Sequence, residues 1–407
     1  MHRFRQACCC VYLFVAVSFG LLGAAHGREP LRAEPQSLER ATPELIKRLR
    51  ADPYDYFRFV NRPWIARVCD AFAKDFQELP VVRLHGDAHV EQFAVTRDAW
   101  GLDDFDDSAR GPAIVDIARF LGSIDLITRQ RSWENNREKL FDRFVEGYKK
   151  GLIEPDYLPP PPDIVRRLRR QAPSTRVEFF AWAERKMQPL PDTVMKAVEA
   201  GVEAFARVVL HERPDLAPDY FRIVRAGAMQ GGVGSAVNPK ALVRVQGPSE
   251  DPADDQILEF KKIGNLGDLS CLKTPTVQPT VRIIDGTKQL GRFNYNILAA
   301  GPEIVVPEVS ARGARLQDWW MRSLDPSYSQ VSLRDLQSVG DLAAISYDAG
   351  VQLGAGRLRN QTALLSVYDR KRILSGTGRL ERRYRQEAKK LVDDLLRGWR
   401  ELSGRGR

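Results

Sequence analysis

Apolar residues recur at helical spacing through the first half of the chain. Phe141, Phe144 and Tyr148 follow one another in steps of three and four, which places them on one face of a helix. Thr42 before Pro43 begins another helix, because threonine caps the first turn and proline favours its first position. We therefore expect helices over residues 43–51, 64–76, 114–127, 137–148, 164–171 and 194–210.

The pattern changes near Tyr220, where short apolar runs of strand-like character replace the helical spacing. We expect strands over residues 221–224, 241–245, 256–261 and 303–309, and helices again over 316–323, 333–351 and 381–402. This order predicts an α+β chain with a helical part over residues 28–215, a small β-rich part over 216–310, and helices over 311–407 that pack on the helical part.

The first 27 residues have the composition of a secretory signal peptide. Arg3 and Arg5 give a basic start, residues 8–25 are apolar, and Ala25 and Gly27 are small residues at the cleavage positions. We expect an exported protein, periplasmic or secreted, with no stable membrane span after cleavage. The alternative is an uncleaved anchor, since the apolar run is near the lower limit for crossing a bilayer.

The composition of the whole chain is that of a globular protein. Of its 407 residues, 43% are hydrophobic and 28% are charged, which suits one large domain or two coupled ones. The net charge of +9 favours anionic partners, but no nucleic-acid motif is present and we expect the charge to be spread over the surface.

Cysteine usage predicts no zinc site, because the chain has no Cys-x-x-Cys pair and no Cys/His cluster. Cys69 and Cys271 are the two cysteines that remain after removal of the first 27 residues. They form either a single disulfide or two buried free thiols, and their positions in the sequence leave both alternatives open.

The candidate chemistry is concentrated in residues 83–120, which contain two histidines and seven aspartates. Carboxylates as close as Asp103, Asp104, Asp106 and Asp107 repel one another, so a positive group should offset them. A metal, a basic partner or a cationic ligand would serve, and Mg²⁺ is typically held by one or two carboxylates plus substrate phosphates. The alternative is a solvated acidic turn.

A second candidate site lies in the β-rich part. Glycines between the first two predicted strands let backbone N–H groups approach phosphates, since glycine has no Cβ to interfere. Lys261 ends the third strand, where a kinase has the lysine that pairs with phosphates. The alternatives are an ordinary turn and a surface lysine. The residues of this candidate site are Gly232, Gly234, Ser235 and Lys261.

The sequences HGDAHVEQF and DDFDDSARGPAIVDIARF carry a resemblance to a known family. They resemble the pattern GDAHxxNF, NDFDE, GP and D-x-x-R of the bacterial family called domain of unknown function 2252. That pattern is in turn similar to the phosphotransferase loops of aminoglycoside kinases. The resemblance implies a protein-kinase-like fold with a mostly helical large lobe and a small antiparallel-sheet lobe. Because the glycine-rich loop follows the catalytic loop here, it also implies a circularly permuted arrangement.

By this likeness Asp87 is the catalytic base that accepts the proton of the acceptor hydroxyl. His85 and His89 flank it in the candidate catalytic loop. Asp116 would brace that loop from the helix that follows.

The same likeness assigns the metal ligands. Asp104 would be the main Mg²⁺ ligand, assisted by Asp106 or Asp107. Gln92 stands where the family has an asparagine that binds a second metal, and the longer glutamine would place its carbonyl elsewhere.

The resemblance extends weakly into the β-rich part. The residues from Gly232 to Ser235 resemble the family's GxGSxG, although Val237 replaces the last glycine, and the run ending at Lys261 resembles LQVKEA. Asp285 stands in a segment similar to RVVEGQR, which implies that it pairs with Lys261.

Three functions follow as hypotheses. The first is a phosphotransferase that uses ATP or another nucleotide with Mg²⁺ and acts on the hydroxyl of an unknown small molecule or protein. The second is an exported pseudokinase-like binding protein, favoured by the departures at residues 92 and 237. The third is a metal-dependent hydrolase. Its candidate residues are His85, Asp87, His89, Asp104 and Asp106. Export to a compartment where ATP is scarce weighs against the first, and the sequence predicts no oligomeric state.

Overall fold

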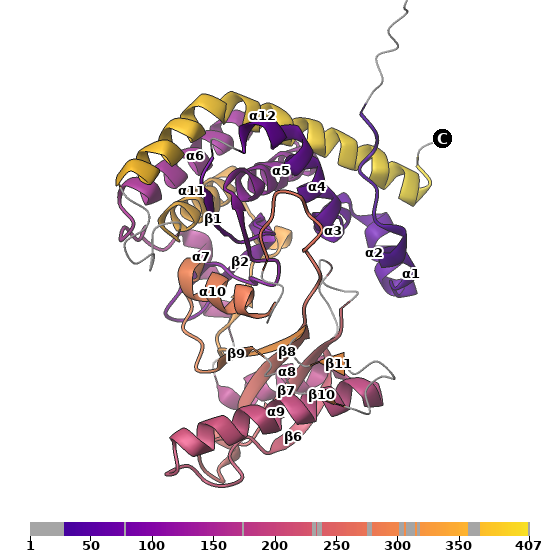
Figure 1. Ribbon diagram of the computed structural model, residues 1–407, viewed down its shortest axis with the longest axis vertical. Coiled ribbons are helices and arrows are strands. Elements are labelled where there is room, and N and C mark those ends of the chain that lie inside the picture. Colours follow the sequence, from indigo (N-terminus) through magenta and orange to yellow (C-terminus); the bar gives the residue numbers. More distant parts are fainter. Residues whose placement is uncertain are drawn as a thin grey trace, which may run out of the picture.

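The computed structural model has a mixed α+β architecture, which confirms the α+β part of the predicted fold class. Helices gather at one end of the molecule and a six-stranded antiparallel sheet lies at the other (Figure 1). The predicted signal peptide and the glycine-rich residues Gly232, Gly234 and Ser235 lie outside the described residues. The structure describes residues 28–76, 79–172, 175–229, 233, 238–274, 279–300, 305–306, 314–315, 318–356 and 367–405.

The helical part forms where the apolar spacing predicts it. Thr42 caps its helix by accepting a hydrogen bond from the backbone of Leu45 at 3.2 Å, as expected. The long α12 lies across the outer side of this part (Figure 1). The helices here are α1 (Pro35–Glu39), α2 (Pro43–Ala51), α3 (Pro53–Phe59), α4 (Asn61–Phe72), α5 (Ile114–Gln130), α6 (Arg137–Ile153), α7 (Asp163–Gln171), α11 (Val339–Gly356) and α12 (Val367–Ser403), with 3₁₀ turns at Ala73–Asp75, Glu134–Asn136 and Leu333–Asp335.

Helices α6 and α11 pack backbone to backbone through glycines. Gly147 and Gly151 lie on one helix and Gly350 and Gly354 on the other, each pair spaced by four residues and so on one face. A Cβ atom on Gly350 would lie 2.3 Å from the carbonyl oxygen of Phe144, which is closer than any real contact. These positions therefore accept only glycine, and the close approach fixes α11 in the middle of the helical part.

The large sheet has the strand order β5-β6-β7-β8-β12-β9. The fifth strand in this order is Trp319–Ser323. A helix was predicted over residues 316–323, and that prediction is wrong for the residues of this strand. The segment is buried on both faces, so its apolar residues show no period that separates strand from helix. The strands are β5 (Met187–Gln188), β6 (Ile223–Met229), β7 (Lys240–Val245), β8 (Gln256–Lys262), β9 (Leu298–Ala300) and β12 (Trp319–Ser323), with a 3₁₀ turn at Pro252–Asp254.

The two faces of this sheet differ in chemistry. Val243, Leu258 and Phe260 point to one face, where α9 (Asp192–Glu212) covers them in an apolar core. The alternate residues, among them Glu259 and Lys261, point to the other face and toward the helical part. Helices α8 (Arg176–Lys186) and α10 (Val281–Leu290) pack at the edges of that face. The sheet therefore presents charged side chains to the gap between the two ends of the molecule.

Short antiparallel strands position the loops that face this charged surface. Loop 85–92 leaves β1 and enters β2, and loop 103–108 connects β3 to β4. β1 pairs with β4, so both loops leave the same small ladder. The strands are β1 (Val81–Leu84), β2 (Phe93–Val95), β3 (Trp100–Leu102), β4 (Ala109–Pro112) and β13 (Ser329–Gln330), and β10 (Val305–Val306) pairs with β11 (Ala314–Arg315) elsewhere.

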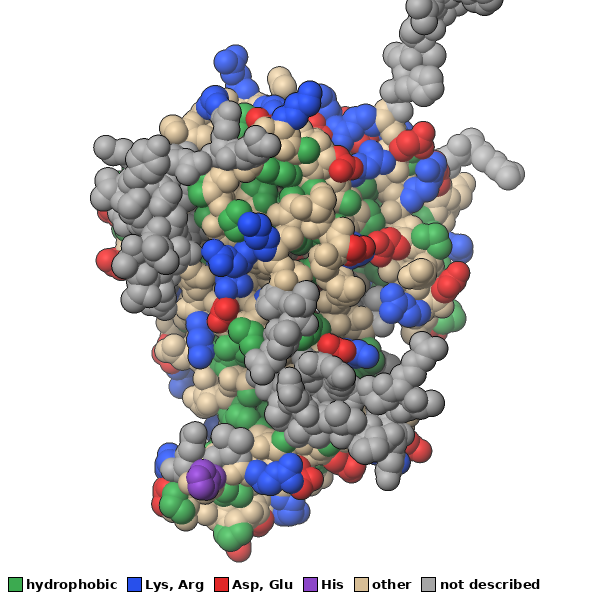
Figure 2. Space-filling model, in the orientation of Figure 1, with side chains coloured by type: hydrophobic (Ala, Val, Ile, Leu, Met, Phe, Trp, Pro, Cys, Tyr) green, Lys and Arg blue, Asp and Glu red, His purple; other side chains and the backbone are tan. Residues whose placement is uncertain are grey.

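A disulfide joins Cys69 to Cys271, which settles the alternative left open by the sequence. It links α4 of the helical part to the segment after β8. On the face shown in Figure 2, basic and acidic side chains are interspersed over the described surface. None of the described helices has the length and apolar character needed to cross a membrane.

Candidate functional site

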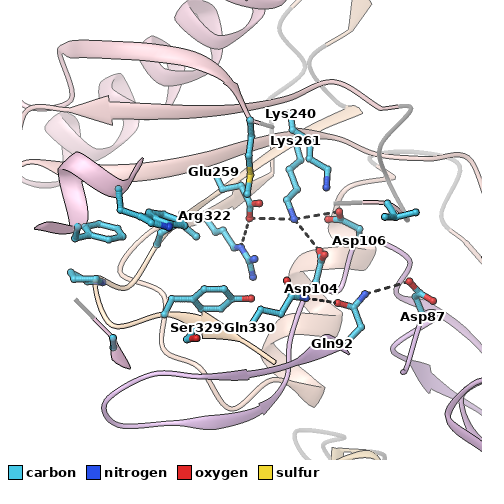
Figure 3. Close-up of a pocket in the computed structure, with 18 of the residues that line it drawn as sticks. Asp87, Gln92, Asp104, Asp106, Lys240, Glu259, Lys261, Arg322, Ser329 and Gln330 are labelled. Atoms are coloured by element: carbon cyan, nitrogen blue, oxygen red, sulfur yellow. Dashed lines mark hydrogen bonds and ion pairs between the residues drawn. The ribbon is translucent and has the colours of Figure 1, made fainter. Parts of the chain in front are cut away.

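A cavity of about 470 Å³ lies between the charged face of the sheet and the two loops, a size typical of small-molecule sites (Figure 3). One end is charged or polar and the other is apolar and aromatic. The polar lining comprises Arg58, Asp87, Gln92, Asp104, Asp106, Asp107, Gln171, Lys240, Glu259, Lys261, Arg322, Ser329 and Gln330, and the apolar lining comprises Ala172, Phe179, Trp182, Met229, Val233, Leu324, Pro326 and Tyr328.

Lys261 is the central cation of the charged end. Its ammonium group lies 2.9 Å from Asp104 Oδ1, 3.2 Å from Glu259 Oε2 and 3.4 Å from Asp106 Oδ2. Burial lowers the pKa of Lys261, but the three carboxylates, Asp104 first, outweigh it and hold that pKa well above the usual value. Lys261 is therefore charged at any physiological pH.

Arg322 is the second buried cation of this end. Its guanidinium donates to Asp103 Oδ2 and to Glu259 Oε2, each at 2.7 Å, and to the hydroxyl of Tyr295 at 2.9 Å. Glu259 thus bridges Arg322 and Lys261, which Figure 3 shows as one connected line of contacts. This network holds the charged side chains of β8 and β12 in position.

Asp104 and Asp106 approach Lys261 from the loop side. Asp104 has a φ of 64°, an unusual left-handed conformation for a non-glycine residue. Burial favours its neutral form, yet Lys261 holds the pKa of Asp104 well below the ordinary value. Burial and the neighbouring Asp104 raise the pKa of Asp106 to about 7. Asp104 is therefore firmly ionised, whereas ionisation of Asp106 is unfavourable without a further cation.

The donor set fits a magnesium ion. The Oδ1 atom of Asp106 is buried and has no hydrogen-bond partner, which is costly for a carboxylate oxygen. Asp104 and Asp106 together supply hard oxygen ligands beside the cavity. Among the described residues, no group of three or more His, Cys, Asp or Glu side chains is arranged as a complete metal site. Two carboxylates are enough for a magnesium ion whose other ligands are phosphates and water.

Asp87 faces the cavity from the first loop. Its Oδ1 accepts a hydrogen bond from Arg119 at 2.9 Å, and its Oδ2 accepts one from Gln92 at 3.3 Å. Burial alone would raise the pKa of Asp87, but Arg119 and His89 lower it to about 2. Arg119 in turn stacks on the ring of Phe57 at 3.6 Å. Asp87 is therefore an oriented, ionised carboxylate.

Gln92, the predicted ligand of a second metal, has its amide engaged on both sides. The nitrogen donates to Asp87, and Oε1 accepts a hydrogen bond from Gln330 at 3.2 Å (Figure 3). The glutamine therefore connects β13 to the first loop instead of directing a free oxygen at Asp104.

The two histidines and Asp116 lie behind the cavity lining. Asp116 accepts hydrogen bonds from the backbone N–H groups of His85 and Gly86, both at 2.9 Å, so the helix that follows does hold this loop. His85 Nε2 contacts the backbone oxygen of Asp103 at 2.9 Å. His89 is fully buried, and burial lowers its pKa to about 4. Neither histidine lines the cavity, so the structure places neither in contact with a substrate there.

The predicted pairing of Asp285 with Lys261 is wrong. The segment forms helix α10, and Asp285 is exposed on it, 2.9 Å from Arg83. Glu259, two residues before Lys261 on the same strand, is the acid that lies beside the lysine instead. Aspartate on the outer face of α10 cannot reach the cavity.

Several lining residues were not predicted from the sequence. Lys240 and Arg322 come from strands on either side of β8, and Trp182 comes from α8. A charged residue at every second position of β8, Glu259 and Lys261, is a signal that could have been used, since alternation assigns both to one face. The partners across the sheet depend on register, which one sequence does not display.

The chain matches the protein-family model described as "Uncharacterized protein conserved in bacteria (DUF2252)" over residues 37–156. This segment includes the loops that carry Asp87, Asp104 and Asp106, and it ends before the large sheet begins. The match confirms the resemblance to that family over this part of the chain. No curated protein matches the chain, and no solved structure does.

Proposed function

We propose that the cavity binds a nucleotide with magnesium and transfers its terminal phosphoryl group to the hydroxyl of a small molecule or protein. One observation carries this proposal. A buried lysine on the sheet, Lys261, contacts a carboxylate from the loop side, Asp104, beside an oriented ionised aspartate, Asp87. Phosphoryl transfer relies on positioning and charge stabilisation, and it requires these parts: a phosphate-binding lysine, a metal-binding aspartate and an aspartate that orients the acceptor.

The order of elements in the sheet supports a kinase-like, circularly permuted arrangement. The glycine-rich connection joins β6 to β7, Lys261 lies on the next strand, β8, and helix α10 follows. A protein kinase likewise has its glycine-rich loop before the strand that carries the lysine. Here these elements come after the loops of Asp87 and Asp104 in the chain, yet Lys261 of β8 lies opposite those loops in space.

The residues of this chain would divide the work as follows. Asp87, held by Arg119, would accept a hydrogen bond from the acceptor hydroxyl and orient it toward the phosphoryl group. Lys261 would neutralise phosphate charge. Asp104 and Asp106 would hold magnesium, which when bound would supply further positive charge to the phosphates.

The apolar end of the cavity suits a nucleobase. The rings of Phe179 and Trp182 stack with centroids 5.9 Å apart and planes inclined by 13°. Leu324 and Pro326 line the same end. A flat base gains both apolar burial and aromatic contact in such surroundings. The two ends of the cavity therefore match the two ends of a nucleotide.

A binding protein without catalysis is the second candidate, and Gln92 favours it. In this structure its oxygen is occupied by Gln330 and its nitrogen by Asp87. If Gln92 cannot bind a second metal, only one metal ion balances the charge of the donor phosphates. The loss of the second ion would lower or abolish turnover.

We propose that the protein is exported from the cytosol. The disulfide between Cys69 and Cys271 supports it, because disulfides persist in oxidising compartments and are rare in the cytosol. In such a compartment the donor can be ATP, another nucleotide or a related phosphate compound.

Turnover separates the two candidates. Protein beginning at Arg28 would be incubated with Mg²⁺, ATP and a library of hydroxyl compounds, and new phosphate esters would be detected by mass spectrometry. We expect products from wild type that disappear in Asp87→Asn and persist in Asp98→Asn, which alters an exposed aspartate. Wild type that binds ATP yet forms no more product than Asp87→Asn would favour the binding protein.

A further inference from the structure

Lys240 differs from every other cation that lines the cavity. It is the first residue of β7, lies directly opposite Lys261 on β8, and lines the cavity beside it (Figure 3). No hydrogen bond or ion pair joins it to another residue in the described parts of the chain. Burial, and then the neighbouring Lys261, lower the pKa of Lys240. Asp104, Asp106 and Glu259 oppose this lowering without contacting Lys240 directly, so its ammonium group remains available to a ligand in this cavity.

The other three lining cations have acids of their own. Arg58 pairs with Glu91 at 2.9 Å, in addition to the partners already described for Lys261 and Arg322. Lys240 is only half-buried, and none of the described acids forms a direct ion pair with its ammonium group. A lysine that lines a cavity in this way can contact an anion that arrives from solution.

We propose that Lys240 and Lys261 bind neighbouring groups of one phosphoanhydride chain, and that Lys240 makes the cavity select a chain of phosphates over a nucleoside. Residues directly opposite on antiparallel strands have Cβ atoms about 4.5–5.5 Å apart, so two such lysines can contact one ligand. Lys261 is in direct contact with three carboxylates, whereas Lys240 has no direct ion pair among the described residues and keeps its ammonium group available to the ligand. The terminal phosphate would contact Lys240 on the sheet side, and magnesium held by Asp104 and Asp106 would join it to the loop side.

The chemistry recognised is a chain of linked phosphates, which occurs both in nucleoside triphosphates and in inorganic polyphosphate. Inorganic polyphosphate matters as a source because an exported protein would work in a compartment where nucleotides are scarce. This inference rests on the proposed function for the identity of the site, but Lys240 would bind inorganic triphosphate even if the donor were not a nucleotide.

The test compares four ligands, each titrated with Mg²⁺ by calorimetry: ATP, ADP, adenosine and inorganic triphosphate. The proteins are wild type, Lys240→Gln, Lys240→Arg and, as a matched control, Lys262→Gln. Lys262 is the neighbour of Lys261 on β8, and it lines a different cavity. Thermal melting of each variant establishes that it is folded.

We expect Lys240→Gln to weaken binding of ATP and triphosphate about 10- to 100-fold, the loss typical of one charged hydrogen bond. Adenosine binding should be unchanged, Lys240→Arg should retain most of the affinity, and Lys262→Gln should match wild type. Equal affinities of Lys240→Gln and Lys262→Gln for ATP and triphosphate would overturn the inference and leave the proposed function standing.

The remaining outcomes separate the two proposals. Binding of triphosphate that depends on Lys240, without binding of ATP, would support the phosphate site and overturn the nucleotide donor. Folded wild type that binds neither ligand would overturn both.

Discussion

The ammonium group of Lys261 lies 2.9 Å from the carboxylate of Asp104, although 157 residues separate them in the chain. The lysine belongs to β8 of the large sheet and the aspartate to the loop between β3 and β4. Lys261 is buried and Asp104 is half-buried, and burial would disfavour the charge of each residue if its partner were absent. The contact therefore ties the sheet to the helical part at the cavity where we place phosphate binding.

Replacement of the two neighbouring lysines should have opposite effects on stability. Lys261→Met leaves the buried Glu259 and the partly exposed Asp104 and Asp106 without their cation, and should lower the free energy of unfolding by about 3 kcal/mol. Lys240→Met removes a half-buried charge without a direct ion pair, for which burial and Lys261 outweigh the more distant carboxylates, and should raise it by about 1 kcal/mol, as at functional sites that sacrifice stability. Urea unfolding followed by tryptophan fluorescence measures both. Destabilisation by both variants to the same extent would contradict the assignment of Lys240.

Glycines between α6 and α11 should tolerate no side chain. Gly354→Ala places a Cβ atom 2.2 Å from the carbonyl oxygen of Tyr148, so the helices must separate, at a cost of about 2–4 kcal/mol. Gly378→Ala is the matched control. It lies on α12 with nothing within 4 Å of its added Cβ, and helix propensity predicts a gain of about 0.5–1 kcal/mol. Equal unfolding midpoints for the two variants would show that the helices are not packed as described.

His89 should make the protein less stable as the pH falls from about 6.5 to about 4. Its pKa is lowered from 6.5 to about 4 in the folded state, so the unfolded chain binds a proton first. The contribution is fully present above pH 6.5 and its loss amounts to about 3 kcal/mol by pH 4. Denaturant unfolding at several pH values should show a weaker dependence for His89→Gln than for wild type. His211→Gln, at an exposed position, should keep the wild-type slope.

The disulfide should contribute to stability because it closes a loop across 202 residues. The double variant Cys69→Ser with Cys271→Ser should lower the free energy of unfolding by about 2–5 kcal/mol. A reducing agent should shift the urea midpoint of wild type toward that of the double variant and leave the variant itself unchanged. A wild-type midpoint that is insensitive to reduction under unfolding conditions would mean that the bond is not formed.

The sequence predicted individual helices and strands better than it predicted the contacts between them. Helical spacing predicted most helices, and a short run of strand-like residues predicted β8. Trp319–Ser323 was missed because a strand that is buried on both faces loses its two-residue period. Asp285 was paired wrongly because resemblance to a short family motif says nothing about which face of a helix the acid occupies.

At the candidate site, the sequence likewise indicated the need for a cation but not which residues supply it. The crowded aspartates at residues 103–107 indicated that a cation was needed, and the structure identifies Lys261 and Arg322 as the cations in contact with them. Arg322 and Lys240 could not be assigned from the sequence, because their position depends on the register between strands far apart in the chain. The pairing of Cys69 with Cys271 was left open because it depends on how helix α4 packs against a loop that is distant in the chain.

The measurement that tests the central claim most directly is a calorimetric titration of folded protein beginning at Arg28 with ATP, with and without Mg²⁺. Wild type and Asp98→Asn should bind ATP saturably in the presence of Mg²⁺ and at least about tenfold more weakly in its absence. Asp104→Asn should lose the effect of Mg²⁺, because it removes a carboxylate that would hold the ion. Binding that is indifferent to Mg²⁺ and to Asp104, or no binding by folded wild type, would contradict a magnesium–nucleotide site in this cavity.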